Sequence, residues 1–254
     1  MRIFARLFLL VPMLAAACGG GPAPAGLDGR VFLSTAVTTG GQPHALVPGT
    51  QVRISFTDRQ ISISAGCNSM GGAYQVVDGQ LVLGGLSMTE MGCDPDRHAQ
   101  DEWVSAFLGA RPMLTLTGNT VVLASPGASI TLLDREIADP DLPLVGPTWT
   151  VVSVISGEAV SSVPAGVVAT ITFGADGQVG FDTSCNSGGG RYTATSDSLK
   201  FTEMVTTLRL CEGPAGAMET SVMRVLGAET VGYRIEAGSL ELGVAGFGLQ
   251  LSGS

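Results

Sequence analysis

The sequence is poor in the side chains that most enzymes and nucleic-acid-binding proteins need. It has two histidines among 254 residues, His44 and His98, and therefore few candidate residues for metal ligation or acid–base catalysis. Lys and Arg total 13 against 22 Asp and Glu, and such dispersed cations form no basic patch. Gly-x-Ser-x-Gly, the usual setting of a hydrolase nucleophile, does not occur. We therefore expect a protein that is not an enzyme, has no cofactor or metal and binds no nucleic acid.

Charged residues are also scarce, at 14%, whereas hydrophobic residues make up 45%. This composition is too apolar for a disordered chain. The 36 glycines follow no three-residue period, so the chain is not collagen-like. A chain of this length can hold one or two domains, each with its own core.

Long apolar runs are missing as well. The apolar run at 7–14 is far shorter than the roughly 20 residues that a spanning helix needs. It follows Arg2 and Arg6 and ends in small residues before Cys18, a pattern typical of a signal for export. A cysteine in this place resembles the lipobox of bacterial lipoproteins, where cleavage leaves a lipid-bearing N-terminal cysteine. We expect a signal peptide at 1–17 and lipidation of Cys18.

The segment around Cys18 leaves one alternative open. Ala15 and Ala17 also suit an ordinary signal peptidase, which would give a secreted or periplasmic protein with a free thiol. Residues 18–26 are rich in Gly, Pro and Ala, and we interpret them as a flexible tether behind the anchor. Without the signal, 11 cations oppose 22 acids, a net charge of −11 (11 − 22). This charge repels anionic headgroups, so attachment to the membrane would depend on the lipid.

The other four cysteines reveal a duplication. Each pair is separated by 26 positions, 93 − 67 in the first and 211 − 185 in the second. The octapeptides that begin at Cys67 and Cys185 share six of eight residues at an offset of 118. Near the start of each copy the offset is 117, so a one-residue insertion precedes Cys185. A period this long indicates a duplicated domain rather than a solenoid.

Four equally spaced cysteines in an exported protein predict one disulfide per copy, Cys67–Cys93 and Cys185–Cys211. Zinc ligation is disfavoured because Cys-x-x-Cys spacing is absent and no adequate set of histidines accompanies the cysteines. A redox pair would also be expected to have Cys-x-x-Cys spacing.

Short alternating segments separated by glycine-bearing turns predict a β-rich fold. Each copy has one candidate helix: the first begins near Asp94-Pro95 and the second near Gly213-Pro214. We expect an α+β fold of two tandem domains, 27–134 and 146–254, joined by a proline-bearing linker at 135–145.

Together these features resemble the META domain family, to which the heat-shock protein HslJ belongs. The resemblance rests on Gly146 to Trp149 and its counterpart Gly29 to Phe32, on the Cys-Asn-x-x-Gly-Gly-x-Tyr block, and on a Met-Thr or Thr-Thr segment before a cysteine and a helix. It covers nearly the whole chain after the tether. The family implies a small antiparallel sheet that curls into a partial barrel with one packed helix. It also implies export or lipid anchoring, a link to stress resistance, and no catalytic residues.

The Cys-Asn-x-x-Gly-Gly-x-Tyr block permits two interpretations. Its amide side chains and open backbone could hold a ligand, or the block could be a tight turn with positive φ at Asn and Gly. The residues concerned are Asn68, Gly71, Gly72, Asn186, Gly189 and Gly190.

Two further clusters have a functional and a structural interpretation. Glu90, Asp94 and Asp96 near His98 could bind a cation, but Asp94 and Asp96 also suit the start of a helix. Trp103 and Phe107 could line an apolar cavity, but they fit core packing better.

Function is less constrained than architecture. The main hypothesis is a binding or stress-tolerance module of the cell envelope. The alternatives are a carrier of apolar ligands inside the half-barrel and a protein-interaction or inhibitor module that uses the loops around the disulfides.

Overall fold

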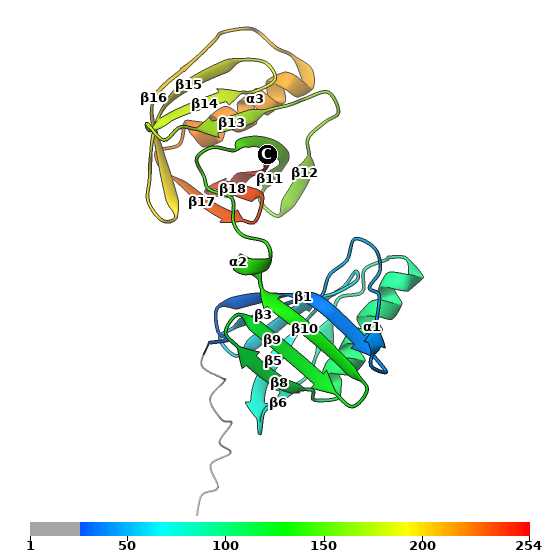
Figure 1. The fold of residues 1–254 in the computed structure, drawn as a ribbon. Coiled ribbons are helices and arrows are strands. Elements are labelled where there is room, and N and C mark those ends of the chain that lie inside the picture. The colour runs from blue at the N-terminus through cyan, green and yellow to red at the C-terminus, as the bar shows by residue number, and fades with distance from the viewer. Residues whose placement is uncertain (1–25) are drawn as a thin grey trace, which may run out of the picture. The chain divides into compact units, whose positions relative to one another are not determined.

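The computed structural model describes residues 26–254, which form two compact units. The division falls between Ala138 and Asp139. We call residues 26–138 domain 1 and residues 139–254 domain 2; both are drawn in Figure 1. The expected signal peptide and Cys18 lie outside the described residues, as does the tether except for its last residue.

Domain 1 is built on one antiparallel sheet in the order β10-β9-β8-β6-β5-β4-β3-β1-β2, with β7 paired to β5. Pairing of β1 with β10 closes eight of these strands into a ring. The strands are β1 (Arg30–Thr39), β2 (Gln42–Pro43), β3 (Arg53–Thr57), β4 (Gln60–Ser64), β5 (Ser69–Val77), β6 (Gln80–Leu83), β7 (Ser87–Met88), β8 (Met113–Thr117), β9 (Thr120–Ser125) and β10 (Ala128–Asp134).

Domain 2 repeats this arrangement in the order β12-β11-β13-β14-β15-β16-β17-β18-β19, and pairing of β11 with β19 closes its ring. Figure 1 shows strands curling around the interior of this unit. The strands are β11 (Thr148–Ser156), β12 (Ala159–Ser162), β13 (Thr170–Phe173), β14 (Gln178–Asp182), β15 (Ser187–Ala194), β16 (Ser198–Thr206), β17 (Val231–Glu236), β18 (Ser239–Val244) and β19 (Phe247–Gly253).

Alternation of apolar and polar residues places each strand in its ring. In β4, Ile61 and Ile63 are 1% exposed, whereas the neighbouring Gln60, Ser62 and Ser64 face solvent. Such a period of two buries one face of a strand and solvates the other. Both interiors are filled by side chains of this kind, with Phe32 against Phe56 in domain 1 and the fully buried Trp149 in domain 2.

One main helix packs on each barrel. In domain 1, α1 (Pro95–Gly109) begins at Asp94, whose side chain accepts a hydrogen bond from the Arg97 backbone N–H. This is the capping role predicted for Asp94. In domain 2, α3 (Gly213–Leu226) has proline in its first turn. Each helix buries an apolar face in the core of its own domain, Val104 and Leu108 being fully buried in the first.

Three expectations change with the structure. Strands dominate both domains, so the α+β class is only roughly right, and pairing between the first and last main strands makes each barrel a closed ring rather than a partial one. Residues 135–145, expected as the linker, contain the short helix α2 (Arg135–Ala138). Leu142, Leu144 and Val145 pack against the core of domain 2, and the Trp149 indole donates to the Leu144 carbonyl at 3.0 Å.

Candidate functional site

The two disulfides lie at matching places in the domains. Cys67 follows β4 and is bonded to Cys93, which precedes α1. Cys185 follows β14 and is bonded to Cys211, which precedes α3. The paired Cα atoms are 6.4 and 6.0 Å apart, within the usual range for disulfides. Each bond therefore ties the end of a strand to the entrance of a helix, with the pairing that the equal spacing predicted.

Asn68, directly after the first cysteine, joins three segments of domain 1. Its side chain is buried, and its Oδ1 accepts hydrogen bonds from the Thr89 hydroxyl at 3.1 Å and from the Met91 backbone N–H at 2.8 Å. Its Nδ2 donates to a carboxyl oxygen of Asp101 on α1 at 3.2 Å. The start of β5, the loop before Cys93 and the helix are thereby held together.

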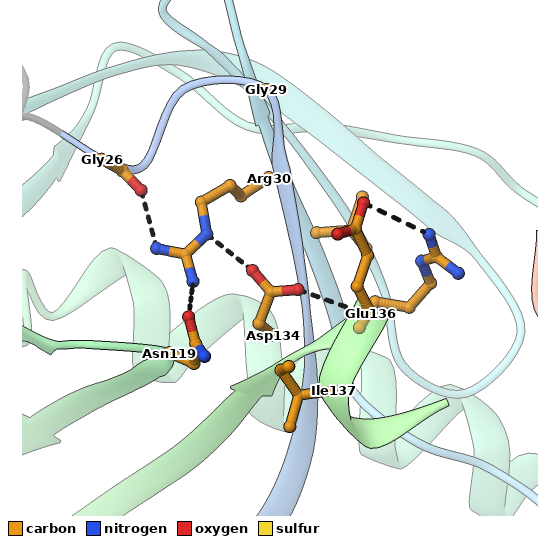
Figure 2. A pocket seen from close by; sticks show the side chains of 9 residues that line it. Gly26, Gly29, Arg30, Asn119, Asp134, Glu136 and Ile137 are labelled. Atoms are coloured by element: carbon orange, nitrogen blue, oxygen red, sulfur yellow. Dashed lines mark hydrogen bonds and ion pairs between the residues drawn. The ribbon is translucent and has the colours of Figure 1, made fainter. Parts of the chain in front are cut away.

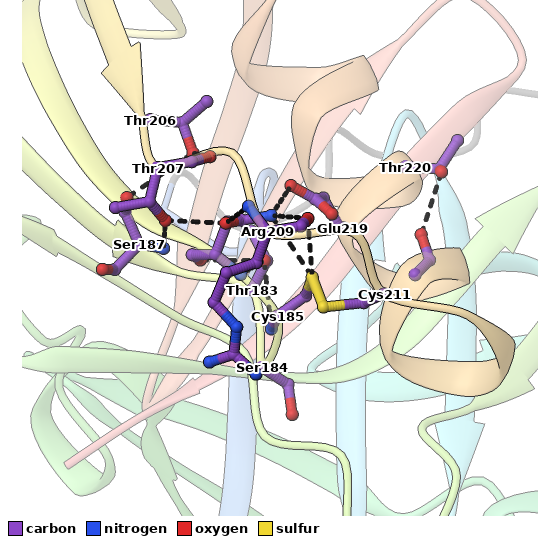
Figure 3. Close-up of a disulfide and its surroundings, with 12 residues drawn as sticks. Thr183, Ser184, Cys185, Ser187, Thr206, Thr207, Arg209, Cys211, Glu219 and Thr220 are labelled. Carbon is purple, nitrogen blue, oxygen red and sulfur yellow. Dashed lines mark hydrogen bonds between the residues drawn. A yellow bond between two sulfur atoms is a disulfide. The ribbon is translucent and has the colours of Figure 1, made fainter.

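Asn186 does the same in domain 2, and Figure 3 shows its partners Thr207, Arg209 and Glu219 beside the disulfide. Its Oδ1 accepts from the Thr207 hydroxyl at 2.7 Å and from the Arg209 N–H at 2.8 Å. Its Nδ2 donates to Glu219 on α3 at 2.7 Å and to the Arg209 carbonyl at 2.9 Å. We call this arrangement, in either domain, the asparagine clasp.

The clasps leave little capacity for a ligand. An amide side chain can donate two hydrogen bonds and accept two, and Asn186 makes all four of these inside its own domain. Buried polar groups that are satisfied in this way fix the local structure. Of the two interpretations of the block, the structure supports an architectural role for Asn68 and Asn186.

The turn geometry expected for this block is wrong. Neither asparagine has a positive φ, and the four glycines also lack one. The glycines lie instead within strands: Gly71 and Gly72 in β5, and Gly189 and Gly190 in β15.

Close packing against neighbouring backbone, of a loop at Gly72 and of a strand at Gly189, explains the glycines. A Cβ at Gly72 would collide with the carbonyl oxygen of Gly85, and one at Gly189 would lie 2.7 Å from the carbonyl oxygen of Val179. At Gly71 a Cβ would stand 3.4 Å from its nearest neighbour, so this glycine is under less constraint.

Asp101 and Glu219, the carboxylates that accept from the two asparagine amides, were not predicted from the sequence. Asp101 is fully buried and accepts backbone N–H groups from Gly66 (2.7 Å), Cys67 (3.0 Å) and Asn68 (2.7 Å). Glu219 occupies the equivalent helical position, at the same offset of 118 (219 − 101). One signal was present: Asp101 lies three and seven residues before the buried Val104 and Leu108, on the apolar face of its helix.

The acidic cluster around His98 serves the helix entrance. Asp94 caps α1 and pairs with Arg97 at 3.4 Å, while His98 Nε2 accepts from the Cys93 backbone N–H at 3.3 Å. Within residues 26–254, no group of three or more His, Cys, Asp or Glu side chains is arranged to hold a metal ion.

A surface pocket of about 440 Å³ lies at the end of domain 1 (Figure 2). Arg30 reaches across it and donates to Asp134 at 2.6 Å, to Asn119 at 2.9 Å and to the Gly26 carbonyl at 3.0 Å. These bonds connect the first strand to the last one. The polar side chains that line the pocket are thus engaged with one another, which favours a structural role for the cluster.

Trp103 and Phe107 belong to a stacked aromatic group. The Trp103 ring lies 4.7 Å from the His44 ring and 5.7 Å from the Phe107 ring, and both pairs are close to parallel. Phe107 is buried in the core of domain 1. The predicted core role therefore fits these two aromatic residues.

The loop before Cys211 exposes apolar side chains to an unusual degree. Leu208 and Leu210 are 94% and 93% exposed, and Val205, near the end of the preceding strand β16, is 70% exposed. Arg209, between the two leucines, is held through its backbone by the asparagine clasp. The fixed backbone thus presents its neighbours to solvent. We call Val205, Leu208 and Leu210 the leucine strip.

The equivalent segment of domain 1 has no leucines and exposes two methionines to a smaller extent: Met91 is 56% exposed and Met88 is 43% exposed. Met91 is held by Asn68 as Arg209 is held by Asn186, but its neighbours are Glu90 and Gly92. The same backbone arrangement therefore presents Glu90, Met91 and Gly92 in domain 1, and Leu208, Arg209 and Leu210 in domain 2.

Comparisons with known proteins identify the family. The META domain model matches residues 26–137 and again residues 142–250. No curated protein matched the chain. Similar solved structures include a protein determined by NMR (28% identity, 42% of this chain and 90% of the other, TM-score 0.35) and one from Burkholderia xenovorans (22% identity, 49% and 98%, TM-score 0.37).

A DNA polymerase III beta chain from Streptococcus pneumoniae TIGR4 also matches, at 11% identity over 92% of this chain and 59% of the other, with a TM-score of 0.18. All three TM-scores are too low to add to the assignment. The two matches to the family model cover most of the chain and coincide with the repeated cysteine and asparagine pattern. The chain belongs to the META domain family and carries two tandem copies of that domain.

Proposed function

We propose that the protein is an exported, lipid-anchored and non-enzymatic module of the cell envelope that binds another protein through the leucine strip of domain 2. The observation that carries this proposal is the near-complete exposure of Leu208 and Leu210 on a loop with a fixed backbone. Large apolar side chains gathered at the surface are typical of interaction sites.

The fixed backbone favours binding in a second way. A disulfide at Cys211 and the two hydrogen bonds between the Asn186 side chain and the Arg209 backbone hold the loop before a partner binds. Less conformational entropy is then lost on association. Burial of each leucine contributes about 1.5–3 kcal/mol, and Arg209 between them supplies a cation for a carboxylate on the partner.

The carrier hypothesis receives no comparable support. The barrel interiors are filled by buried aliphatic and aromatic side chains, among them Phe56 in domain 1 and Trp149 in domain 2. An apolar ligand would have to displace these side chains from a packed core. We therefore favour the surface of the barrel over its interior as the place of binding.

Export and lipidation rest on separate support. Disulfides persist in oxidising compartments outside the cytosol, and both META domains contain one. None of the helices in residues 26–254 has the length and apolar character needed to span a bilayer. An intact-mass measurement of the mature protein tests the anchor: lipid on an N-terminal Cys18 supports it, and an unmodified N-terminus contradicts it.

A paired-variant experiment tests the binding surface. Cross-linking in intact envelopes identifies a partner, which is purified and titrated against the protein. Leu208→Ser with Leu210→Ser should weaken its affinity at least about tenfold, the equivalent of about 1.4 kcal/mol. The matched control changes two other exposed aliphatic residues of domain 2, Val160→Ser and Val168→Ser, and should leave the affinity unchanged.

Two results would overturn the proposal. Unchanged affinity of the Leu208 and Leu210 double variant would show that the strip is not the binding surface. Turnover of a substrate that is abolished by alanine at one residue cluster would show that the protein is an enzyme.

A further inference from the structure

The two domains differ at the turn that faces one of their tyrosines. Between Phe56 and Gln60, domain 1 has three residues, whereas between the equivalent Phe173 and Gln178, domain 2 has four. This is the one-residue insertion that changes the repeat offset from 117 to 118. In domain 1 the turn is a tight hairpin with positive φ at Asp58 and Arg59.

The longer turn of domain 2 provides a hydrogen-bond acceptor for Tyr192. Its hydroxyl donates to the carbonyl oxygen of Gly174 at 2.9 Å. Tyr192 also packs edge-on against Phe173, with ring centroids 5.0 Å apart. The longer turn thus gives the Tyr192 hydroxyl a hydrogen-bond acceptor within the domain.

Tyr74, the equivalent residue of domain 1, has no such acceptor. It packs against Phe56 in the same edge-on manner at 5.0 Å, and it is only 2% exposed. Among buried side-chain nitrogen and oxygen atoms of the described residues, its hydroxyl is the one without a hydrogen-bond partner. An unsatisfied buried hydroxyl destabilises the folded domain, so a ligand that accepts its hydrogen bond removes this cost.

Tyr74 lines an opening of about 320 Å³, which we call the Tyr74 pocket, together with Asp28, Asp58 and Arg59. Burial first, and the Asp28 carboxylate second, raise the pKa of Tyr74, which keeps the hydroxyl protonated as a donor. Arg59 has no ion-pair or hydrogen-bond partner for its guanidinium among residues 26–254. The pocket therefore combines two donors with two carboxylates that accept hydrogen bonds.

We propose that the Tyr74 pocket binds small ligands that carry a secondary amide, with the amide carbonyl taking the place that the Gly174 carbonyl has in domain 2. The Tyr74 hydroxyl donates to that carbonyl, and Asp28 or Asp58 accepts from the amide N–H. Arg59 donates to a second oxygen of the ligand. Peptides and N-acetylated sugars both present this group.

Titrations followed by ¹⁵N NMR test the proposal. The probes are N-acetylglycine methylamide, as a minimal peptide, and N-acetylglucosamine, with glucose as the sugar that lacks the amide. At least one amide probe should produce saturable shifts at Asp28, Asp58 and Tyr74, and glucose should not. Binding of one probe but not the other assigns the source of the amide.

Variants connect the binding to the hydroxyl. Tyr74→Phe should weaken the affinity about three- to tenfold, while the matched control Tyr192→Phe should not change it. Replacing Thr57-Asp58-Arg59 with the four residues of the domain 2 turn should abolish binding, since it removes Asp58 and Arg59 from the pocket and provides a carbonyl for Tyr74.

Three outcomes would overturn the proposal: no saturable shift with either amide probe, equal shifts with glucose, or unchanged affinity after Tyr74→Phe. Stability provides a separate check. Tyr192→Phe removes a hydrogen bond and should destabilise domain 2, whereas Tyr74→Phe should not destabilise domain 1. An equal loss of stability in both domains would show that a bound water already accepts a hydrogen bond from the Tyr74 hydroxyl. This result would also contradict the proposal.

Discussion

In both domains a carboxylate on the main helix accepts a hydrogen bond from the asparagine of the clasp, but the two carboxylates differ in burial and in their other partners. Asp101 is fully buried and receives three backbone N–H groups as well as the Asn68 amide. Glu219 is half-buried and receives only the Asn186 amide. In domain 2 the hydroxyl of Thr183 takes over the backbone N–H of Asn186, at 2.9 Å. The clasp itself is therefore maintained while the residues that support it differ.

Comparison of the two clasps shows which residues the two copies share and which differ between them. Both domains keep the disulfide and the asparagine with its backbone partners on the loop before the second cysteine. The side chains next to those partners are free to change, from Glu90 and Gly92 to Leu208 and Leu210. A rigid loop with variable neighbours is suited to the evolution of a binding surface in one copy alone.

The largest expected effect is the loss of Asp101. Asp101→Ala leaves three backbone N–H groups, one of them on the buried Asn68, and the Asn68 amide without their acceptor, so we expect the free energy of unfolding of domain 1 to fall by about 3 kcal/mol or more. Glu219→Ala removes one hydrogen bond from a half-buried site and should cost domain 2 about 1 kcal/mol.

Each domain contains one of the two tryptophans, Trp103 and Trp149, so their indole N–H signals can follow the two domains separately in urea. Asp96→Ala, at an exposed position of α1, serves as the control and should change stability by less than about 1 kcal/mol. Equal losses from Asp101→Ala and Glu219→Ala would refute the distinction between the two carboxylates.

A smaller effect is expected at the strand glycines. Gly189→Ala places a methyl group 2.7 Å from the Val179 carbonyl oxygen and should destabilise domain 2 by about 1–3 kcal/mol. Gly71→Ala, at the equivalent position of domain 1, meets only ordinary contacts at 3.4 Å and should be close to neutral. The same urea titration compares them, and a neutral Gly189→Ala would show that β14 and β15 can separate without cost.

These glycines also mark where prediction from sequence fails. The β-rich fold was predicted from alternating segments such as Gln60–Ser64, now strand β4, whose apolar residues repeat with a period of two. Strands β5 and β15 were interpreted as a turn, since glycine has no side chain to display that period. Their need for glycine comes from backbone that other segments bring close, which the local sequence does not reveal.

The site was predictable to a similar extent. The disulfide pairs and the cap at Asp94 follow from spacing and local chemistry. Asp101 and Tyr74 could not be assigned in that way, because their roles depend on which backbone groups distant segments bring near them. Comparison of the two copies would have pointed to the turn beside Tyr74, since the repeat offset changes there.

The smallest expected effect concerns alkaline pH. Burial is the main cause that raises the pKa of Tyr74 and of Tyr192 above the ordinary value of 10.0. Below that value both hydroxyls are protonated in the folded and the unfolded chain, and stability does not depend on their titration. As the pH rises above it, the unfolded chain loses these protons first, so each domain loses stability until the pH passes the folded pKa. Tyr74→Phe should remove this part of the pH dependence from domain 1 only, and Tyr192→Phe from domain 2 only. Urea midpoints of the Trp103 and Trp149 signals between about pH 9 and 11 measure it, and a slope in domain 1 that survives Tyr74→Phe would assign the effect to another group.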